Sequence, residues 1–368
     1  MWLKIQQERI KKQIDNNITK VMEHGQYILG PEVSLLEEKL SSYVGTKYAI
    51  GCSSGTDALL MALMAHGIKG DNCTIFTTPF TFISTAEVAK LLGVNVVFVD
   101  IDPLTWNINP KRLYDTLVQQ NFNGRGGVIA VDIFGVPAYY KMIKKVADMF
   151  NLFVIEDGAQ SFGAEVDGKK ACSFADIGCT SFFPSKPLSC YGDGGMCFTD
   201  DEKLNNLLLS IRSHGKSSHK YDNVRLGING RLDSIQAAIL LAKMEIFDDE
   251  LEKRRNVAKK YDELFKDIFS IRTQKIPSNC KSAWAQYSIL FESSDIRNIV
   301  KNTLINSNVY YPKPLHLQDV FKNVYSLPGD FPISERISET ILSIPMHPYL
   351  TFEEQQKIVE VIYENVAL

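Results

Sequence analysis

The sequence lacks the features of a metal-binding, secreted or membrane protein. Its seven cysteines include no CxxC pair, so no zinc site is expected, and most should be small buried hydrophobes. The six histidines show no spacing typical of metal ligands. No run of about eighteen apolar residues suggests a membrane span, and residues 1–25 lack the apolar core of a signal peptide. These absences favour a cytoplasmic protein without a metal.

An excess of charge of one sign is also missing. The formal net charge of the 368 residues is −3, which gives no electrostatic reason to expect a nucleic acid or a membrane as partner. Hydrophobic residues make up 45% of the chain and charged residues 23%, which is ordinary for a globular enzyme. The length fits one large domain and a smaller one.

Short apolar runs alternate with helical stretches over the first two hundred residues. This alternation predicts an α/β fold with a mostly parallel sheet between helices. The segment at 197–199 is expected to add an antiparallel strand. The expected strands are 47–51, 73–77, 95–99, 128–133, 152–156, 178–182 and 195–199, and the expected helices are about 3–24, 31–44 and 57–66.

A long helical pattern from about residue 231 to 265 should carry the chain into a second, smaller unit. That unit shows a strand at 285–291 and a closing helix at 352–365. We therefore expect residues 1–250 to form a large ligand-binding domain with N-terminal helices. Residues 251–368 should form a small C-terminal α/β domain.

Residues 154–195 carry the strongest functional signal. Asp157 and Gln160 end an apolar strand, and Lys186 follows behind a segment with Ser181. Alone, Asp157 could be a helix cap or an ion-pair partner, and Lys186 a surface lysine. Together they fit pyridoxal 5′-phosphate (PLP): the lysine forms a Schiff base, the carboxylate keeps the pyridine nitrogen protonated, and the amide bonds the phenolic oxygen.

The loop at 51–56 joins an expected strand to an expected helix. Its sequence, GCSSGT, is rich in small residues, and such a loop exposes backbone N–H groups at the positive end of a helix. A plain tight turn is the alternative. Beside Lys186, we expect Gly55 and Thr56 to bind the PLP phosphate, helped by Ser181. No GxGxxG motif appears in the chain, and no GK[ST] follows this loop.

Several motifs give the chain a family resemblance over nearly its whole length. It resembles the DegT/DnrJ-type sugar aminotransferases, which are PLP enzymes of aspartate-aminotransferase fold type I. The motifs are GQYILGPEV at 25–33, CSSGTDALLMAL at 52–63, TPFTFIST at 78–85, EDGAQSFGA at 156–164, SFFPSK at 181–186, YGDGG at 191–195, GINGRLDSIQAAI at 227–239 and SIPMHPYL at 343–350.

The resemblance implies further roles at the cofactor. Phe82 stacks on the PLP ring, although an ordinary core phenylalanine is the alternative. Asn229 reaches the PLP phosphate of the neighbouring subunit, so that two copies of the chain share their active sites in a homodimer. Some relatives carry histidine in place of Lys186 and act as dehydrases, so the lysine favours transamination. The expected cofactor residues are Gly55, Thr56, Phe82, Asp157, Gln160, Ser181, Lys186 and Asn229.

The substrate side is drawn from two other segments. Residues 309–318, VYYPKPLHLQ, resemble the substrate motif of the family, which implies contacts from Tyr310, Tyr311 and His316. Relatives often have histidine where this chain has Tyr310. Arg231 is a candidate for binding a substrate carboxylate, because its guanidinium suits that group. A local Arg231–Asp233 ion pair is the alternative.

The resemblance implies transfer of an amino group from L-glutamate to a nucleotide-linked keto-sugar. The motifs are most similar to those of enzymes that aminate C3 of UDP-2-acetamido-2-deoxy-3-oxo-glucuronate for surface polysaccharides such as lipopolysaccharide O-antigen. A dTDP-3-keto-6-deoxyhexose or a 4-keto-sugar is an alternative substrate. A PLP lyase on the same fold is a further alternative. A non-enzymatic sensor is disfavoured by the intact set of Asp157, Gln160, Ser181 and Lys186.

Overall fold

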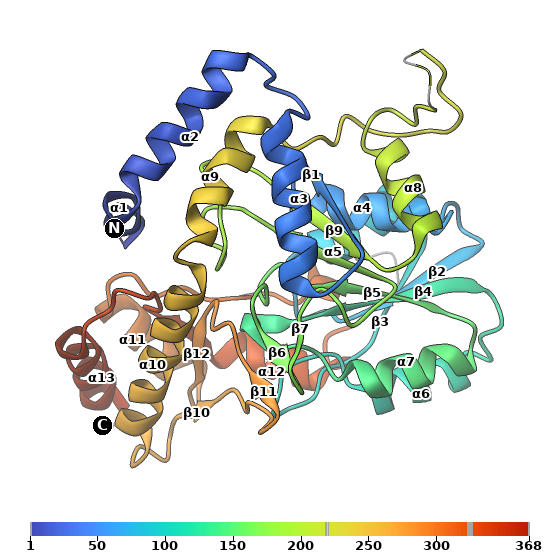
Figure 1. The fold of residues 1–368 in the computed structure, drawn as a ribbon. Helices are drawn as coiled ribbons and strands as arrows, with labels where there is room; N and C mark the ends of the chain where they lie inside the picture. The colour runs from blue at the N-terminus through green and yellow to red at the C-terminus, as the bar shows by residue number, and fades with distance from the viewer. Residues whose placement is uncertain (1, 218, 220, 322–326, 367–368) are drawn as a thin grey trace.

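A seven-stranded sheet organises the large N-terminal part of the chain (Figure 1). The structure is a computed structural model that describes residues 2–217, 219, 221–321 and 327–366. The strand order is β1-β9-β8-β5-β4-β2-β3. The strands span Tyr48–Cys52 (β1), Cys73–Thr77 (β2), Asn95–Phe98 (β3), Arg125–Val131 (β4), Phe153–Asp157 (β5), Ile177–Ser181 (β8) and Gly195–Thr199 (β9).

The sheet is mostly parallel, as predicted. Strands β3, β2, β4, β5 and β8 run parallel to one another. Strand β9 is antiparallel to both β8 and β1, which confirms the antiparallel strand expected near 197–199. The expected strands all form, with their ends shifted by at most a few residues. The α/β fold class is therefore confirmed.

Helices cover both faces of the sheet, and alternate strand residues therefore enter different cores. Ile155 packs in a cluster with α4 (Gly55–Ala65), α5 (Ser84–Leu91) and α8 (Glu202–Ile211). Val154, one residue earlier, packs in a cluster with α6 (Pro110–Gln119) and α7 (Tyr140–Met149). Figure 1 shows α6 and α7 on one side of the sheet and α4 on the other. Burial on both faces explains why these strands read as continuous apolar runs.

The N-terminal region differs from the single helix expected over 3–24. It forms α1 (Trp2–Arg9) and α2 (Lys11–His24), separated at Ile10, whose φ of −121° and ψ of 18° are not helical. Ile10, the residue at the break, is buried against Ile239 of a later helix. Helix α3 (Pro31–Val44) begins and ends as predicted, with Pro31 in its first turn and Gly45 at a φ of 83° after its end.

The long helix expected over 231–265 is also broken. It consists of α9 (Ser234–Met244) and α10 (Phe247–Phe265), and Ile246 between them has a φ of −115°. Phe247 and Leu251 pack with the core of the large sheet, whereas Val257 and later residues of α10 pack with the C-terminal sheet. The domain division between 250 and 251 falls inside α10 and stays a prediction.

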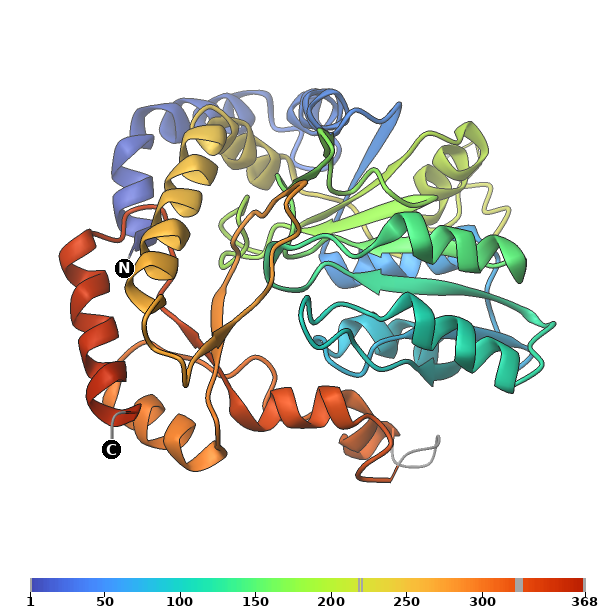
Figure 2. The ribbon, with the colours of Figure 1, turned by 90° about the horizontal axis from the view of Figure 1, so that it is seen from below.

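The C-terminal elements gather on one side of the molecule (Figure 2). A three-stranded sheet of β10, β12 and β13 packs with α10, α11 and α13. A second small sheet joins β11 to β6 and β7 of the large part. The remaining bounds are Glu165–Val166 (β6), Lys169–Lys170 (β7), Arg272–Thr273 (β10), Cys280–Lys281 (β11), Tyr287–Leu290 (β12), Ile341–Ile344 (β13), Ser294–Thr303 (α11), Pro332–Thr340 (α12), Phe352–Val366 (α13), and the 3₁₀ turns Ile133–Gly135 (η1), Leu315–Leu317 (η2) and Asp319–Phe321 (η3).

None of the helices in the described ranges is long and apolar enough to cross a membrane.

Candidate active site

Asp157 lies at the carboxyl end of β5 and is only 6% exposed. Its Oδ2 accepts a hydrogen bond of 2.7 Å from the Thr85 hydroxyl, and its Oδ1 accepts one of 3.3 Å from the Ala159 N–H. Burial raises the pKa of Asp157, and the nearby Lys186 opposes this shift. A buried carboxylate in this position is stabilised by a cation. The site therefore favours a ligand with a protonated nitrogen next to Asp157.

Lys186 follows β8 in a segment that turns back on itself. Its backbone N–H donates to the Phe183 carbonyl at 2.9 Å. The residue is partly exposed. Burial of its ammonium group lowers the pKa of Lys186, and the nearby Asp157 carboxylate opposes this shift. A lowered pKa increases the neutral amine, which is the nucleophilic form. Lys186 and Asp157 thus influence each other's pKa, and their shared role at one site stays a prediction.

Gln160 connects the large domain with a C-terminal tyrosine. Its side-chain Oε1 accepts a hydrogen bond of 2.8 Å from the Phe134 N–H, and its Nε2 donates one of 3.0 Å to the Tyr311 hydroxyl. The Phe82 ring lies 6.4 Å from the Tyr311 ring, and Phe82 is 56% exposed. The structure therefore brings Gln160, Tyr311 and Phe82 to one place, with an aromatic face accessible to a ligand.

The start of α4 forms a tight cradle against β8. A Cβ atom on Gly55 would lie 2.7 Å from the Ser181 Cβ, so only glycine allows the loop to approach Ser181 this closely. The Ser54 hydroxyl caps the helix by accepting from the Asp57 N–H at 3.0 Å. The Thr56 hydroxyl lies 2.7 Å from the Ser84 hydroxyl. Backbone N–H groups at such a helix start suit a phosphate.

Arg212 and Glu37 brace the strand that enters this cradle. One guanidinium nitrogen of Arg212 donates to Glu37 at 2.5 Å and to the Gly51 carbonyl at 3.0 Å. Glu37 also accepts from the Gly51 N–H at 2.8 Å. The Arg212 carbonyl accepts from the Gly230 N–H at 3.0 Å, so the same brace holds the segment that contains Asn229. No local sequence signal links positions 37 and 212.

Asn229 and Arg231 do not join the group around Asp157 within this chain. Asn229 is exposed and forms a backbone bridge with Ser213. Arg231 forms a backbone bridge with Cys52, beside the cradle. Within the described residues, the alternative Arg231–Asp233 ion pair does not form, and the buried Nε of Arg231 has no hydrogen-bond partner. In the part of the chain that the structure describes, neither side chain has a polar partner that would fix it locally.

His316 requires a correction. The sequence suggests a substrate contact, but the His316 side chain is fully buried in η2. Its Nε2 lies 3.1 Å from a carboxylate oxygen of Glu335, and its ring packs against Phe331. Burial lowers the pKa of His316. A side chain with no exposed surface cannot contact a substrate, so His316 is a packing residue in this structure.

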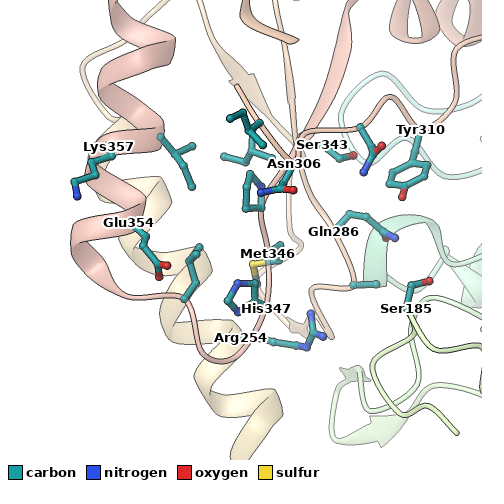
Figure 3. A pocket seen from close by; sticks show the side chains of 17 residues that line it. Ser185, Arg254, Gln286, Asn306, Tyr310, Ser343, Met346, His347, Glu354 and Lys357 are labelled. Carbon is teal, nitrogen blue, oxygen red and sulfur yellow. The ribbon is translucent and has the colours of Figure 1, made fainter. Parts of the chain in front are cut away.

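A cavity of about 570 Å³ lies beside the lysine segment (Figure 3). Ser185 and Tyr310 line its end nearest the active site, and Glu354 and Lys357 of α13 line the opposite end. Gln286 projects into the space between them. Tyr310, unlike Tyr311, therefore borders this cavity. The cavity therefore adjoins the lysine segment at Ser185, but none of the residues proposed to hold the cofactor lines it.

The residues gathered here fit PLP. The cradle of Gly55, Thr56 and Ser181 suits its phosphate, the buried Asp157 carboxylate suits its pyridinium nitrogen, and Lys186 supplies an amine beside Asp157. No group of three or more histidine, cysteine, aspartate or glutamate side chains that could hold a metal occurs among the described residues. Fold and site together define a PLP-dependent α/β enzyme.

Comparison with known proteins identifies its family. Residues 8–363 match the model of the DegT/DnrJ/EryC1/StrS aminotransferase family, and the chain belongs to this family. It is 42% identical to UDP-2-acetamido-2-deoxy-3-oxo-D-glucuronate aminotransferase of Pseudomonas aeruginosa, over 95% of this chain and 94% of that protein. The recognition from sequence and the assignment as an aminotransferase are thereby confirmed.

Solved structures agree with the family and the cofactor. A DegT/DnrJ/EryC1/StrS aminotransferase from Brucella abortus is 44% identical, with a TM-score of 0.94 over 100% of this chain and 98% of that one. NtdA from Bacillus subtilis, solved with bound cofactor PMP, is 26% identical, with a TM-score of 0.89 over 98% of this chain and 82% of that one. The expected pyridoxal cofactor is confirmed at the level of the family.

Proposed function

We propose that this enzyme transfers the amino group of L-glutamate to C3 of UDP-2-acetamido-2-deoxy-3-oxo-glucuronate, for the synthesis of surface polysaccharides such as lipopolysaccharide O-antigen in the cytoplasm. The Lys186–Asp157 pair beside the phosphate cradle supports transamination. The 42% identity to the Pseudomonas aeruginosa enzyme over 95% of the chain supports this sugar in particular. The cavity beside Ser185 and Tyr310 offers space near the lysine for a large substrate.

The residues of the chain have separate tasks in this reaction. PLP, when bound, supplies a ring that accepts electrons from the substrate carbon. The Lys186 amine would hold the cofactor and, as a free amine, would move the proton at Cα of the donor. Asp157 would keep the pyridine nitrogen protonated. The cradle with Gly55, Thr56 and Ser181 would hold the phosphate, and the exposed Phe82 ring would pack against the cofactor ring.

The direct test of this function is a substrate screen. The purified enzyme, loaded with PLP and supplied with L-glutamate, should form one equivalent of 2-oxoglutarate per site without a keto-sugar and should continue to turn over only when a keto-sugar is present. Turnover should be fastest with the UDP-3-keto-uronate. Faster turnover of a dTDP-3-keto-6-deoxyhexose would contradict the sugar while leaving the aminotransferase intact. Turnover of an amino acid without any keto-sugar would favour a PLP lyase.

Arg231 should distinguish acidic from neutral sugars. If its guanidinium binds the C5 carboxylate of the substrate, R231A should lower kcat/KM for the uronate by about tenfold or more, and for a neutral 3-keto analogue by much less. Steady-state kinetics on both sugars measures the difference. R231K keeps the charge but loses the bidentate geometry, so its kcat/KM for the uronate should lie between those of the wild type and R231A. Equal losses on both sugars would make Arg231 a structural residue.

The active site should be shared by two copies of the chain, with Asn229 reaching the cofactor phosphate of the partner. A mixture of inactive K186A chains with inactive N229A chains should then regain part of the wild-type activity. A hybrid dimer keeps one site with both Lys186 and Asn229 intact. The measurement is the activity of the dimer fraction, isolated by size after the two chains are mixed and refolded together.

The control for this mixing experiment is a K186A chain mixed with a K186A/N229A chain. That hybrid has no intact lysine and should stay inactive. An active monomer at assay concentration, shown by light scattering, would contradict the shared site.

A further inference from the structure

Two carboxyl side chains lie fully buried behind the strand ends that carry Asp157 and Gln160. Asp132 follows β4, Glu156 lies in β5, and neither has exposed surface. Successive residues of a strand face opposite sides of the sheet. Glu156 therefore points to the α6–α7 side, with Val154, whereas Asp157 points to the α5 side, where Thr85 binds it. The two buried acids form a group separate from the catalytic carboxylate.

The two acids bind donors from several segments. One oxygen of Asp132 accepts from the Ala138 N–H at 2.9 Å and from the Tyr140 hydroxyl at 2.8 Å, and the other accepts from the Ser161 hydroxyl at 2.6 Å. Glu156 accepts from the backbone N–H groups of Cys172 and Phe174. The two side chains are placed for a hydrogen bond to each other. Tyr140, which binds Asp132, also donates to the carbonyl of Ala130, the cross-strand partner of Glu156.

A hydrogen bond between the two carboxyl groups requires a proton, because an ionised carboxylate has no donor. No lysine, arginine or histidine among the described residues forms an ion pair with either acid. Burial raises the pKa of both Asp132 and Glu156. Asp132 accepts three hydrogen bonds and Glu156 accepts two, so a single negative charge is better stabilised on Asp132. Two adjacent charges in such a place would be strongly unfavourable.

We propose that Glu156 stays protonated and donates to the Asp132 carboxylate, and that this acid pair positions Asp157 and Gln160 for the reaction. The backbone N–H of Asp132 donates to the Asp157 carbonyl at 3.1 Å. Ser161, held by Asp132, directly follows Gln160. Glu156 directly precedes Asp157. The pair thus holds the backbone before Asp157 and after Gln160, the two residues that face the cofactor.

The proton also limits the negative charge behind Asp157. The other titratable groups that face the pair are Tyr140 on α7, Asp157 on β5, Cys172 after β7 and Cys280 on β11. All four are neutral or anionic, so none offsets a second charge. Ionisation of both acids would drive apart the segments that they join.

Infrared spectroscopy of the PLP-loaded enzyme tests the protonation without any substrate. At about pH 8 a free carboxyl group is ionised, so a carbonyl stretch typical of a protonated carboxylic acid should come from the pair. The band should shift when only glutamate carries ¹³C, and it should be lost in E156Q. It should persist in D157N, which excludes Asp157 as its source. Absence of the band in the wild type, or its shift with ¹³C-aspartate alone, would overturn the proposal.

The positioning role is tested by two variants with the same loss of acidity. E156Q keeps an N–H donor toward Asp132, whereas E156L keeps none. With saturating PLP and L-glutamate, E156L should lower the rate of the donor half-reaction by about tenfold or more, because misplaced groups react slowly. E156Q should restore most of that rate. A folded, PLP-saturated E156L as fast as the wild type would refute the positioning role. If E156L does not fold, an E156Q enzyme no faster than one-tenth of the wild type would refute it equally.

Discussion

Replacing Lys186 with alanine should lower transamination by about 10³-fold or more while the fold and PLP binding are retained. In the proposed mechanism this residue supplies both the amine that holds the cofactor and the group that moves the substrate proton. Its lowered pKa, caused by burial, increases the neutral form that both tasks require. The measurement is the rate of 2-oxoglutarate formation in K186A with saturating PLP, together with circular dichroism for the fold.

Lys243 is a matched control for this experiment. It is another buried lysine, in α9, and burial lowers its pKa to about 8. Its ammonium group contacts the Ser189 hydroxyl and the Tyr191 ring rather than the carboxylate of Asp157. Borohydride reduction should therefore attach the cofactor to Lys186 and leave Lys243 unlabelled. A label on Lys243, or steady turnover by purified K186A, would contradict the assignment.

Much of the fold was predictable, and the centre of the site could be proposed, because both depend on local patterns. Buried strands such as Val154–Asp157 read as apolar runs, and a polar residue at a strand end is visible directly after such a run. Asp157 and Lys186 could therefore be proposed as site residues from their flanking residues. The cradle could also be predicted, since Gly55 must be small where the loop meets Ser181.

Other features depend on contacts between distant residues and could not be predicted. Helical periodicity continues across Ile10 and Ile246, because it records which residues are apolar and not the direction of the helix axis. His316 looked like a substrate contact because nothing nearby in sequence indicates its partner Glu335. The pairing of Glu156 with Asp132 likewise arises only when β4 and β5 lie side by side.

Replacing Asp157 with asparagine should lower transamination on the order of 10²-fold, or about 2.7 kcal/mol in the barrier. The change keeps the shape of the side chain and removes the charge that we propose holds the pyridine nitrogen protonated. An asparagine can still accept the hydrogen bond from Thr85, so PLP should remain bound. The measurement is kcat in D157N at a PLP concentration that saturates the variant.

Thr85 separates the charge of Asp157 from its placement. T85V removes the 2.7 Å hydrogen bond to Asp157 but keeps the carboxylate. This hydrogen bond lowers the pKa of Asp157, so its loss should raise that pKa further. As the pH is lowered, Asp157 should then become protonated, and activity should be lost, at a higher pH in T85V than in the wild type. At neutral pH the loss of rate should be only several-fold, in line with one hydrogen bond. If T85V were as slow as D157N, placement rather than charge would explain the role of Asp157. Near-normal turnover by PLP-saturated D157N would remove Asp157 from the mechanism altogether.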